Sequence, residues 1–165
     1  MKATKRAVGF NLVELVIVVV IIGVVAAIAV PRISRAARGA ADSAVRADLA
    51  ALRNAVDLYY AEHNGEFPGQ DRSQETLVQQ LTGKTDVFGN TGATQEHIYG
   101  PYLPGGVPAL SVGPNRGATG VRVAETGPTV DETAVDIGWV YNCRTGDIIA
   151  NTDDVDEAGI GYDIY

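Results

Sequence analysis

Acidic side chains cluster near the end of the sequence, where their type and spacing could hold a metal ion. Four of the five positions from 153 to 157 are Asp or Glu, and Asp153, Asp154 and Asp156 are the candidate ligands. Calcium takes six to eight oxygen ligands and favours loops of this kind. The spacing does not match an EF-hand loop. Two interpretations therefore stay open, a calcium site and a solvated acidic segment.

Catalytic motifs are absent from the sequence. It contains no Gly-x-Ser-x-Gly elbow, phosphate-binding loop or His-Glu-x-x-His motif. Its two histidines, His63 and His97, have no Ser, Cys or carboxylate partner at a motif spacing. A lone histidine near a helix C-terminus more often complements the helix dipole than binds a metal. We therefore predict that this protein is not an enzyme.

One carboxylate, Glu14, interrupts the most apolar part of the sequence. Between Phe10 and Val30 the only other strongly polar residue is Asn11. These positions span about 32 Å as a helix, close to a hydrocarbon core of roughly 30 Å. Three basic residues and no acid precede them, which predicts a cytoplasmic N-terminus and an exported C-terminal portion. A carboxylate in such a segment costs about 2.5–3.5 kcal/mol on insertion scales, so a cation is expected at the same depth.

Three interpretations compete for this N-terminal segment. It could be a signal peptide cleaved after Ala27-Ile28-Ala29, a permanent signal anchor, or a prepilin leader cut between Gly9 and Phe10. Only the last creates the expected cation, because the new α-amine of Phe10 would lie four residues before Glu14. That amine could pair with Glu14 of a neighbouring subunit in a packed array of helices. Otherwise Glu14 snorkels towards the membrane interface.

The segment from Gly9 to Pro31 resembles the N-terminal signature of type IV pilins and type II secretion pseudopilins. It begins Gly-Phe-Asn-Leu-Val-Glu-Leu and continues as an apolar run. The resemblance implies a prepilin peptidase that cuts after Gly9 and N-methylates Phe10, and a role for Glu14 in assembly. It also implies that the apolar helix first anchors the subunit in the inner membrane and then packs inside a filament. Asn11 departs from the pattern, since Thr or Ser is commoner there.

Helical periodicity continues beyond Pro31, where we expect a gentle kink or local melting because proline removes a helical hydrogen bond. Charged residues at i,i+4 spacing on another face of this helix, including the pair Arg53 and Asp57, are interpreted as solvated. Asn64-Gly65 is a helix stop signal. The apolar positions predicted to form one buried face are Ala41, Val45, Leu49, Leu52, Val56 and Tyr59. The other charged residues of the solvated face are Arg38, Asp42 and Arg46.

The segment from Tyr59 to Pro68 carries a second resemblance. It is similar to the Tyr…Asn-Gly-x-aromatic-Pro segment that ends the long helix of major pseudopilins and many pilin-like proteins. Here glycine stops the helix, and the aromatic residue and proline are expected to hold the turn against it.

Beyond this turn the sequence predicts a small domain with long loops. Residues 73–81 form a short helix with Ser73 as its N-cap. Residues 83–134 contain ten Gly and five Pro, a loop-like composition. Two turns are expected there around buried aromatic residues, one at 86–90 that carries Phe88 and one at 100–104. Residues 121–124 form a short strand.

A hairpin is predicted near the end of the sequence, from strands at 135–142 and 148–151 joined by a turn at 144–147. It resembles the Trp-x-Tyr…Gly-x-Ile-x-x-Asn hairpin of pilin-like heads. Trp139 and Tyr141 are interpreted as core residues that cover the long helix, and Cys143 as a small buried hydrophobe. The expected fold is therefore α+β: a long N-terminal helix packed on a small C-terminal antiparallel sheet with long loops.

Composition narrows the class of protein further. The chain has 165 residues, 13 basic and 20 acidic side chains, and a net charge of −7. Residues 64–165 carry 15 acidic and 5 basic residues, which argues against a nucleic-acid partner. A single cysteine excludes an intramolecular disulfide. The resemblance includes pseudopilins whose C-terminal loop is held by calcium, and this chain has no cysteine pair for that task.

The predicted domain organisation is a leader at 1–9, a membrane and assembly helix at 10–30, an amphipathic helix at 31–64 and an exported head at 65–165. The predicted function is a structural subunit of a type II secretion pseudopilus or a type IV pilus-like filament. The partners that the resemblance implies are copies of itself in a helical homopolymer, prepilin peptidase, an inner-membrane assembly platform, minor pilin-like subunits and, before assembly, the lipid bilayer. The alternative is a membrane-anchored or secreted periplasmic binding domain that forms no filament.

Overall fold

The computed structural model describes residues 11–165, so Gly9 and Phe10, the predicted cleavage and methylation site, lie outside the described residues. The chain divides into an N-terminal unit ending at Ala37 and a C-terminal unit that begins at Arg38. The elements in chain order are α1 (Leu12–Glu62), α2 (Gln74–Thr82), β1 (Gly120–Ala124), β2 (Ile137–Asn142), β3 (Ile148–Ala150) and the 3-10 helix η1 (Tyr162–Ile164). The protein is therefore α+β, as predicted.

The long helix α1 follows the predicted boundaries within the described residues. Its backbone stays helical through position 31, so the local melting expected there is not observed. The helix ends at the predicted stop signal, where Asn64 and Gly65 take positive φ angles of 58° and 78°. The amide of Gly65 donates to the carbonyl of Tyr60 at 3.0 Å, which satisfies one of the last helical carbonyls.

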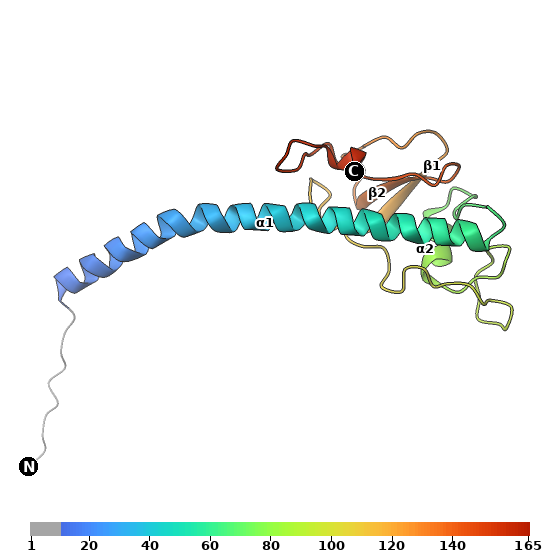
Figure 1. The fold of residues 1–165 in the computed structure, drawn as a ribbon, viewed down its shortest axis with the longest axis horizontal. Helices are drawn as coiled ribbons and strands as arrows, with labels where there is room; N and C mark the ends of the chain where they lie inside the picture. The colour runs from blue at the N-terminus through green and yellow to red at the C-terminus, as the bar shows by residue number, and fades with distance from the viewer. Residues whose placement is uncertain (1–10) are drawn as a thin grey trace, which may run out of the picture. The chain divides into compact units, whose positions relative to one another are not determined.

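In the C-terminal unit, α1 buries the predicted apolar face. Val45, Leu49, Leu52, Val56 and Tyr59 are each at most 3 % exposed. They share one hydrophobic cluster with side chains of the sheet and of α2, and β1 and β2 lie beside this part of α1 (Figure 1). Each large apolar side chain buried in this way contributes about 1.5–3 kcal/mol. Ala41, the sixth predicted position, is only half-buried. The helical periodicity therefore predicted correctly which side of α1 the rest of this unit covers from Val45 onwards.

The sheet has three strands in the order β1-β2-β3, and the predicted antiparallel arrangement is wrong for one of its two pairings. Strands β2 and β3 form the expected antiparallel hairpin, but β1 pairs with β2 in parallel. Parallel neighbours need a crossover of about a dozen residues or more. The segment 125–136 between β1 and β2 has that length, so the chain can return before β2 begins and both strands run the same way.

Strand β2 supplies the centre of the core. Trp139 and Tyr141 are fully buried, as predicted, and each places its polar atom on a main-chain carbonyl. Trp139 Nε1 donates to Pro108 O at 2.8 Å, and the Tyr141 hydroxyl donates to Pro68 O at 3.2 Å. Cys143 is buried as expected. These bonds join the sheet to two loop segments and give both buried polar groups, the indole N–H and the tyrosine hydroxyl, a hydrogen-bond partner.

The start of α2 and the long loop after it also agree with the sequence-based prediction. The side chain of Ser73 caps α2 by accepting a hydrogen bond from Thr76 N at 3.3 Å, as predicted. Residues 83–119 contain no named helix or strand, although Thr85 forms isolated bridges with Thr91 and Tyr99. The predicted loop is thus a chain of ordered turns.

Candidate functional site

The N-terminal part of α1 exposes an unbroken apolar surface. All of its Val, Leu and Ile side chains from Leu12 to Val30 are between 46 % and 76 % exposed. Among residues 11–165, α1 is the one helix that is long and apolar enough to cross a membrane, and none of its most apolar window is buried. A helix that is hydrophobic on all sides is stable in lipid or inside a bundle of helices. This surface is the main candidate for function.

Glu14 lies at the start of that surface and forms a capping box with Asn11. The side chain of Asn11 accepts a hydrogen bond from Val13 N at 3.2 Å. In return, the Glu14 carboxylate accepts one from Asn11 N at 3.0 Å. This reciprocal pair satisfies two of the amides that a helix N-terminus leaves free. Glu14 therefore has a partner within its own chain, which was not predicted, although the spacing Asn-x-x-Glu before an apolar run is the sequence signal for it.

The three predicted calcium ligands do not form a common site. Asp153 and Asp154 are exposed, whereas Asp156 is buried. The Asp156 carboxylate already accepts hydrogen bonds from four groups, and within residues 11–165 no group of three His, Cys, Asp or Glu side chains converges as a metal site would require. The four donors are Ala158 N and Ile160 N at 2.8 Å, the Tyr165 hydroxyl at 2.6 Å and Arg46 Nη2 at 2.7 Å. The arrangement does not fit the proposed ion.

Charged residues of α1 bind the C-terminal segment and form what we call the C-terminal clamp: Asp42, Arg46, Arg53, Asp156, Tyr162 and Tyr165. Arg46 pairs with Asp156 and lies over the Tyr165 ring at 4.5 Å from its centroid. Asp42 accepts from the Tyr162 hydroxyl. Arg53 donates to the carbonyls of Ile148 and Tyr165. Asp42 and Arg53 are half-buried, so the interpretation as a solvated face is wrong for these two residues. Arg46 keeps a side chain that is 56 % exposed, although it also binds the C-terminal segment.

Hydrogen bonds in the clamp shift the acidity of its members. The Tyr165 hydroxyl, the amides of Ile160 and Ala158, and Arg46 together lower the pKa of the Asp156 carboxyl below its usual range. Burial, followed by the hydrogen bond to Asp42, raises the pKa of Tyr162 above its ordinary value. Asp156 is therefore held as a carboxylate, and Tyr162 as a neutral hydroxyl donor. No sequence motif predicts the pairs of Asp156 with Arg46 and of Tyr162 with Asp42, because these partners are 110 and 120 residues apart.

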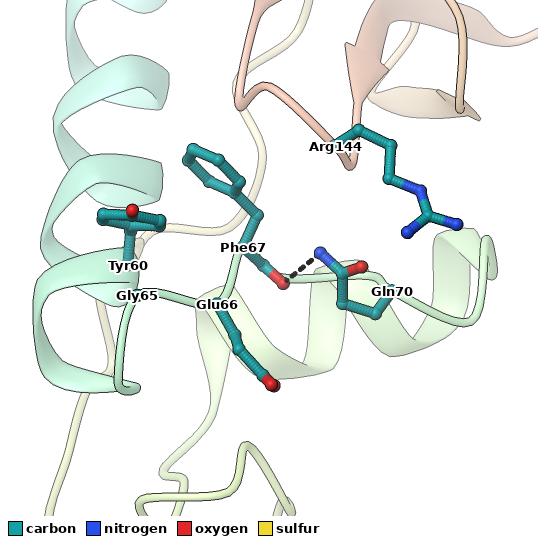
Figure 2. A pocket seen from close by; sticks show the side chains of 6 residues that line it. All are labelled: Tyr60, Gly65, Glu66, Phe67, Gln70 and Arg144. Atoms are coloured by element: carbon teal, nitrogen blue, oxygen red, sulfur yellow. Dashed lines mark hydrogen bonds between the residues drawn. The ribbon is translucent and has the colours of Figure 1, made fainter.

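Two hollows lie on the surface of the C-terminal unit. The first, of about 460 Å³, is lined by the residues drawn in Figure 2, where the rings of Tyr60 and Phe67 stand on one side and Arg144 on the other. Gln70 is part of the lining and donates to Phe67 O at 3.1 Å and Cys143 O at 2.7 Å. The second, which we call the Tyr165 pocket, has a volume of about 280 Å³ and is lined by Arg46, Leu49, Arg53 and Tyr165. Neither lining pairs a nucleophile with a base.

Both histidines form contacts with neighbouring side chains of the C-terminal unit. His63 is buried and its ring stacks on Tyr59 at a centroid distance of 3.7 Å. Its Nδ1 lies 2.8 Å from Tyr59 O, and its Nε2 lies 2.9 Å from the Thr85 hydroxyl. His63 therefore joins the end of α1 to the loop at Thr85 instead of only complementing the helix dipole. His97 contacts Thr94 through Nδ1 at 2.7 Å.

The turn at 86–90 differs from its prediction. Phe88 was expected to be buried there, but its side chain is 79 % exposed. The polar atoms of the turn satisfy each other: the Asp86 carboxylate accepts hydrogen bonds from the amides of Phe88 and Asn90, both at 2.9 Å. The turn therefore needs no buried aromatic ring to hold its shape, and the ring is directed to solvent.

In comparisons with known proteins, no family model matches the chain, and no curated protein or solved structure matches it either.

Proposed function

We propose that this protein is a structural subunit of a pilin-like filament, either a type II secretion pseudopilus or a type IV pilus. The observation that carries the proposal is the apolar surface of α1 from Leu12 to Val30, which is exposed on every side. The signature from Gly9 to Pro31 supports it. A helix of this kind is stable in a bilayer before assembly and among copies of itself afterwards.

The proposed sequence of events uses residues of the N-terminal segment. The basic leader keeps the N-terminus in the cytoplasm while the rest of the chain is exported across the inner membrane. A prepilin peptidase cuts after Gly9 and methylates the amine of Phe10. Glu14 of one subunit then pairs with that amine on a neighbour while an inner-membrane assembly platform adds subunits, with minor pilin-like subunits as further partners.

The capping box adds one step to this proposal. Before assembly the Glu14 carboxylate is satisfied by Asn11 N, which lowers the cost of placing it at the membrane. Pairing with a neighbouring amine requires this carboxylate either to exchange its partner or to accept from both groups, and a carboxylate has acceptor sites for both. Glu14 can thus remain in its own helix cap while it binds a second subunit.

The first experiment is the mass of the N-terminal peptide of the protein in its native host. A mature chain that begins at Phe10 with one added methyl group is the expected result. A chain that begins at Val30 would identify an ordinary secreted domain, and an intact Met1 would identify a signal anchor. Either of these results would refute the filament proposal.

A second candidate function is a membrane-anchored or secreted periplasmic binding domain that forms no filament. The capping box favours it, because Glu14 already has a hydrogen-bond partner without a neighbouring subunit. Two substitutions distinguish the candidates. Glu14→Gln keeps an acceptor for Asn11 N but removes the charge, whereas Glu14→Ala removes both. A filament that depends on the ion pair fails to assemble with either variant, although both are still cleaved. A plain anchor is indifferent to Glu14→Gln in every assay.

A further inference from the structure

An exposed aromatic ring on an ordered turn is an unusual feature of the C-terminal unit. Phe88 is 79 % exposed, yet its turn is fixed from several directions. Besides the two amides bound by Asp86, the Asn90 side chain donates to the Asp86 carboxylate at 2.8 Å. Gln80 of α2 donates to Gly89 O at 3.0 Å. An aromatic side chain held in this way loses little conformational freedom when it binds, which is typical of residues that dominate interfaces.

The Tyr165 pocket has the size and chemistry to receive such a ring. It is an open hollow on the surface with a volume of about 280 Å³. Its walls are the ring of Tyr165 and two guanidinium groups, and Leu49, which is 1 % exposed, lies beneath them. Guanidinium groups bind the face of an aromatic ring with about 0.5–2 kcal/mol, and Arg46 already makes such a contact with Tyr165.

The charges of the two features are complementary. Arg53 in the pocket donates to main-chain oxygens of Ile148 and Tyr165 and, among the described residues, forms no ion pair with an Asp or Glu side chain. Asp86 in the turn accepts from Asn90 and two amides, and within residues 11–165 it forms no ion pair with a lysine or arginine. Docking the turn on the pocket would bring this acidic group towards Arg53 and towards Arg46, which also pairs with Asp156.

The turn and the pocket cannot meet within one chain. The turn lies against the Tyr59 hydroxyl, since a Cβ added at Gly89 would be 2.3 Å from it, whereas the pocket is built around Leu49. Ten residues of helix separate these two levels, about 15 Å along α1. A contact between two different surfaces of identical subunits is heterologous and can continue indefinitely, as a helical filament requires.

We infer that Phe88 of one subunit inserts into the Tyr165 pocket of a second copy of this chain, and that this contact joins neighbouring heads in the assembly. The inference rests on the proposed filament function and gives it a specific contact outside the apolar helix. It also predicts the axial offset between adjacent subunits. If their helices are parallel, the two copies are shifted by about 15 Å along α1.

Photocrosslinking of the full-length chain tests this inference. Benzoyl-phenylalanine replaces Phe88 in protein expressed in membranes with a prepilin peptidase, and assembled material is collected by sedimentation and irradiated. The expected product is a dimer in which the peptide containing residue 88 is joined to a peptide containing Leu49 or Tyr165. Ile98, which is 69 % exposed in the same loop region, is the matched control position and should give no such product.

Substitutions provide the second measurement. Phe88→Ala is expected to lower the sedimenting fraction about tenfold or more, as loss of an interface anchor does, whereas Phe88→Trp and Ile98→Ala stay within twofold of wild type. Filaments that form normally with Phe88→Ala, or that crosslink elsewhere, including to a different protein, would refute this contact and leave the filament proposal intact. Absence of any filament from the processed wild-type chain would refute both.

Discussion

Two leucines of the same helix provide the sharpest test of how α1 packs in the C-terminal unit. Leu52 is 1 % exposed and belongs to the hydrophobic cluster, whereas Leu58 is 51 % exposed. The two lie only six residues apart, in one helix. Truncating each to alanine removes the same atoms, so any difference between the variants reports the difference in their surroundings.

The expected magnitudes follow from burial. Leu52→Ala loses the transfer free energy of its side chain and leaves a cavity, which costs about 3 kcal/mol within a usual range of about 2–5 kcal/mol. For a unit of this size, 1 kcal/mol lowers the melting temperature by roughly 4 °C, so we expect a decrease of about 12 °C. Leu58→Ala changes a surface position and should stay within about 0.5 kcal/mol of wild type, or roughly 2 °C.

The fluorescence of Trp139 is a suitable assay. It is the only tryptophan in the chain, it is fully buried, and it shares the cluster with Leu52. Thermal unfolding of the full-length protein in detergent, followed at this residue, therefore reports the core of the C-terminal unit. Equal decreases for the two variants, or a larger decrease for Leu58→Ala, would show that α1 packs with a different face and would refute the assignment of the core.

Three further predictions concern the C-terminal clamp, the turn between β2 and β3, and the acidic segment at 153–157. The folded protein lowers the pKa of Asp156. The Asp156 carboxylate therefore stabilises the fold at pH values above the usual carboxyl pKa, and this contribution is lost as the pH falls through the lowered pKa. A series of melting temperatures against pH should thus be flatter for Asp156→Asn than for wild type or Asp153→Asn. Gly146→Ala should lower the melting temperature, since φ is +79° and the added Cβ would lie 2.4 Å from the Phe67 ring, whereas Gly105→Ala meets open space and should be neutral. Millimolar calcium should leave the melting temperature unchanged, and an increase of several degrees would show that the acidic segment rearranges to bind it.

The elements that local signals define could be predicted from the sequence. Ser73 begins α2 because its hydroxyl caps a free amide, and Asn64-Gly65 ends α1 because both residues adopt left-handed backbone angles. The hairpin of β2 and β3 and the burial of Trp139 also follow from patterns within a few residues. In each case the interactions that determine the structure lie within one turn of the chain or one face of an element.

Features that depend on distant partners could not be predicted in this way. The parallel pairing of β1 with β2 is decided by how the crossover between them returns, and strand composition does not encode it. The spacing of Arg46 and Asp42 along α1 indicated a solvated face, but their partners are Asp156 and Tyr162 near the other end of the chain. Charge spacing within one helix carries no information about such partners.

The capping box of Asn11 and Glu14 was not predicted either, although its signal is local and visible in the sequence. The argument for a cation near Glu14 depended on the cost of an unsatisfied carboxylate in an apolar segment. Asn11 N reduces that cost within the same helix. The carboxylate alone therefore does not require a neighbouring subunit, and the weight of the filament proposal shifts to the exposed apolar surface and to the processing site that the N-terminal mass will test.

The C-terminal clamp connects stability with the proposed contact between subunits. The chain has one cysteine, and the three acidic residues predicted to bind calcium do not converge. The C-terminal segment is instead held on α1 by the ion pair of Arg46 with Asp156 and by the tyrosine hydroxyls. Because Tyr165 is both a member of this clamp and a wall of the Tyr165 pocket, loosening the clamp also disturbs the pocket. Asp156→Asn should accordingly weaken the crosslink from position 88 even at neutral pH, where the protein remains folded.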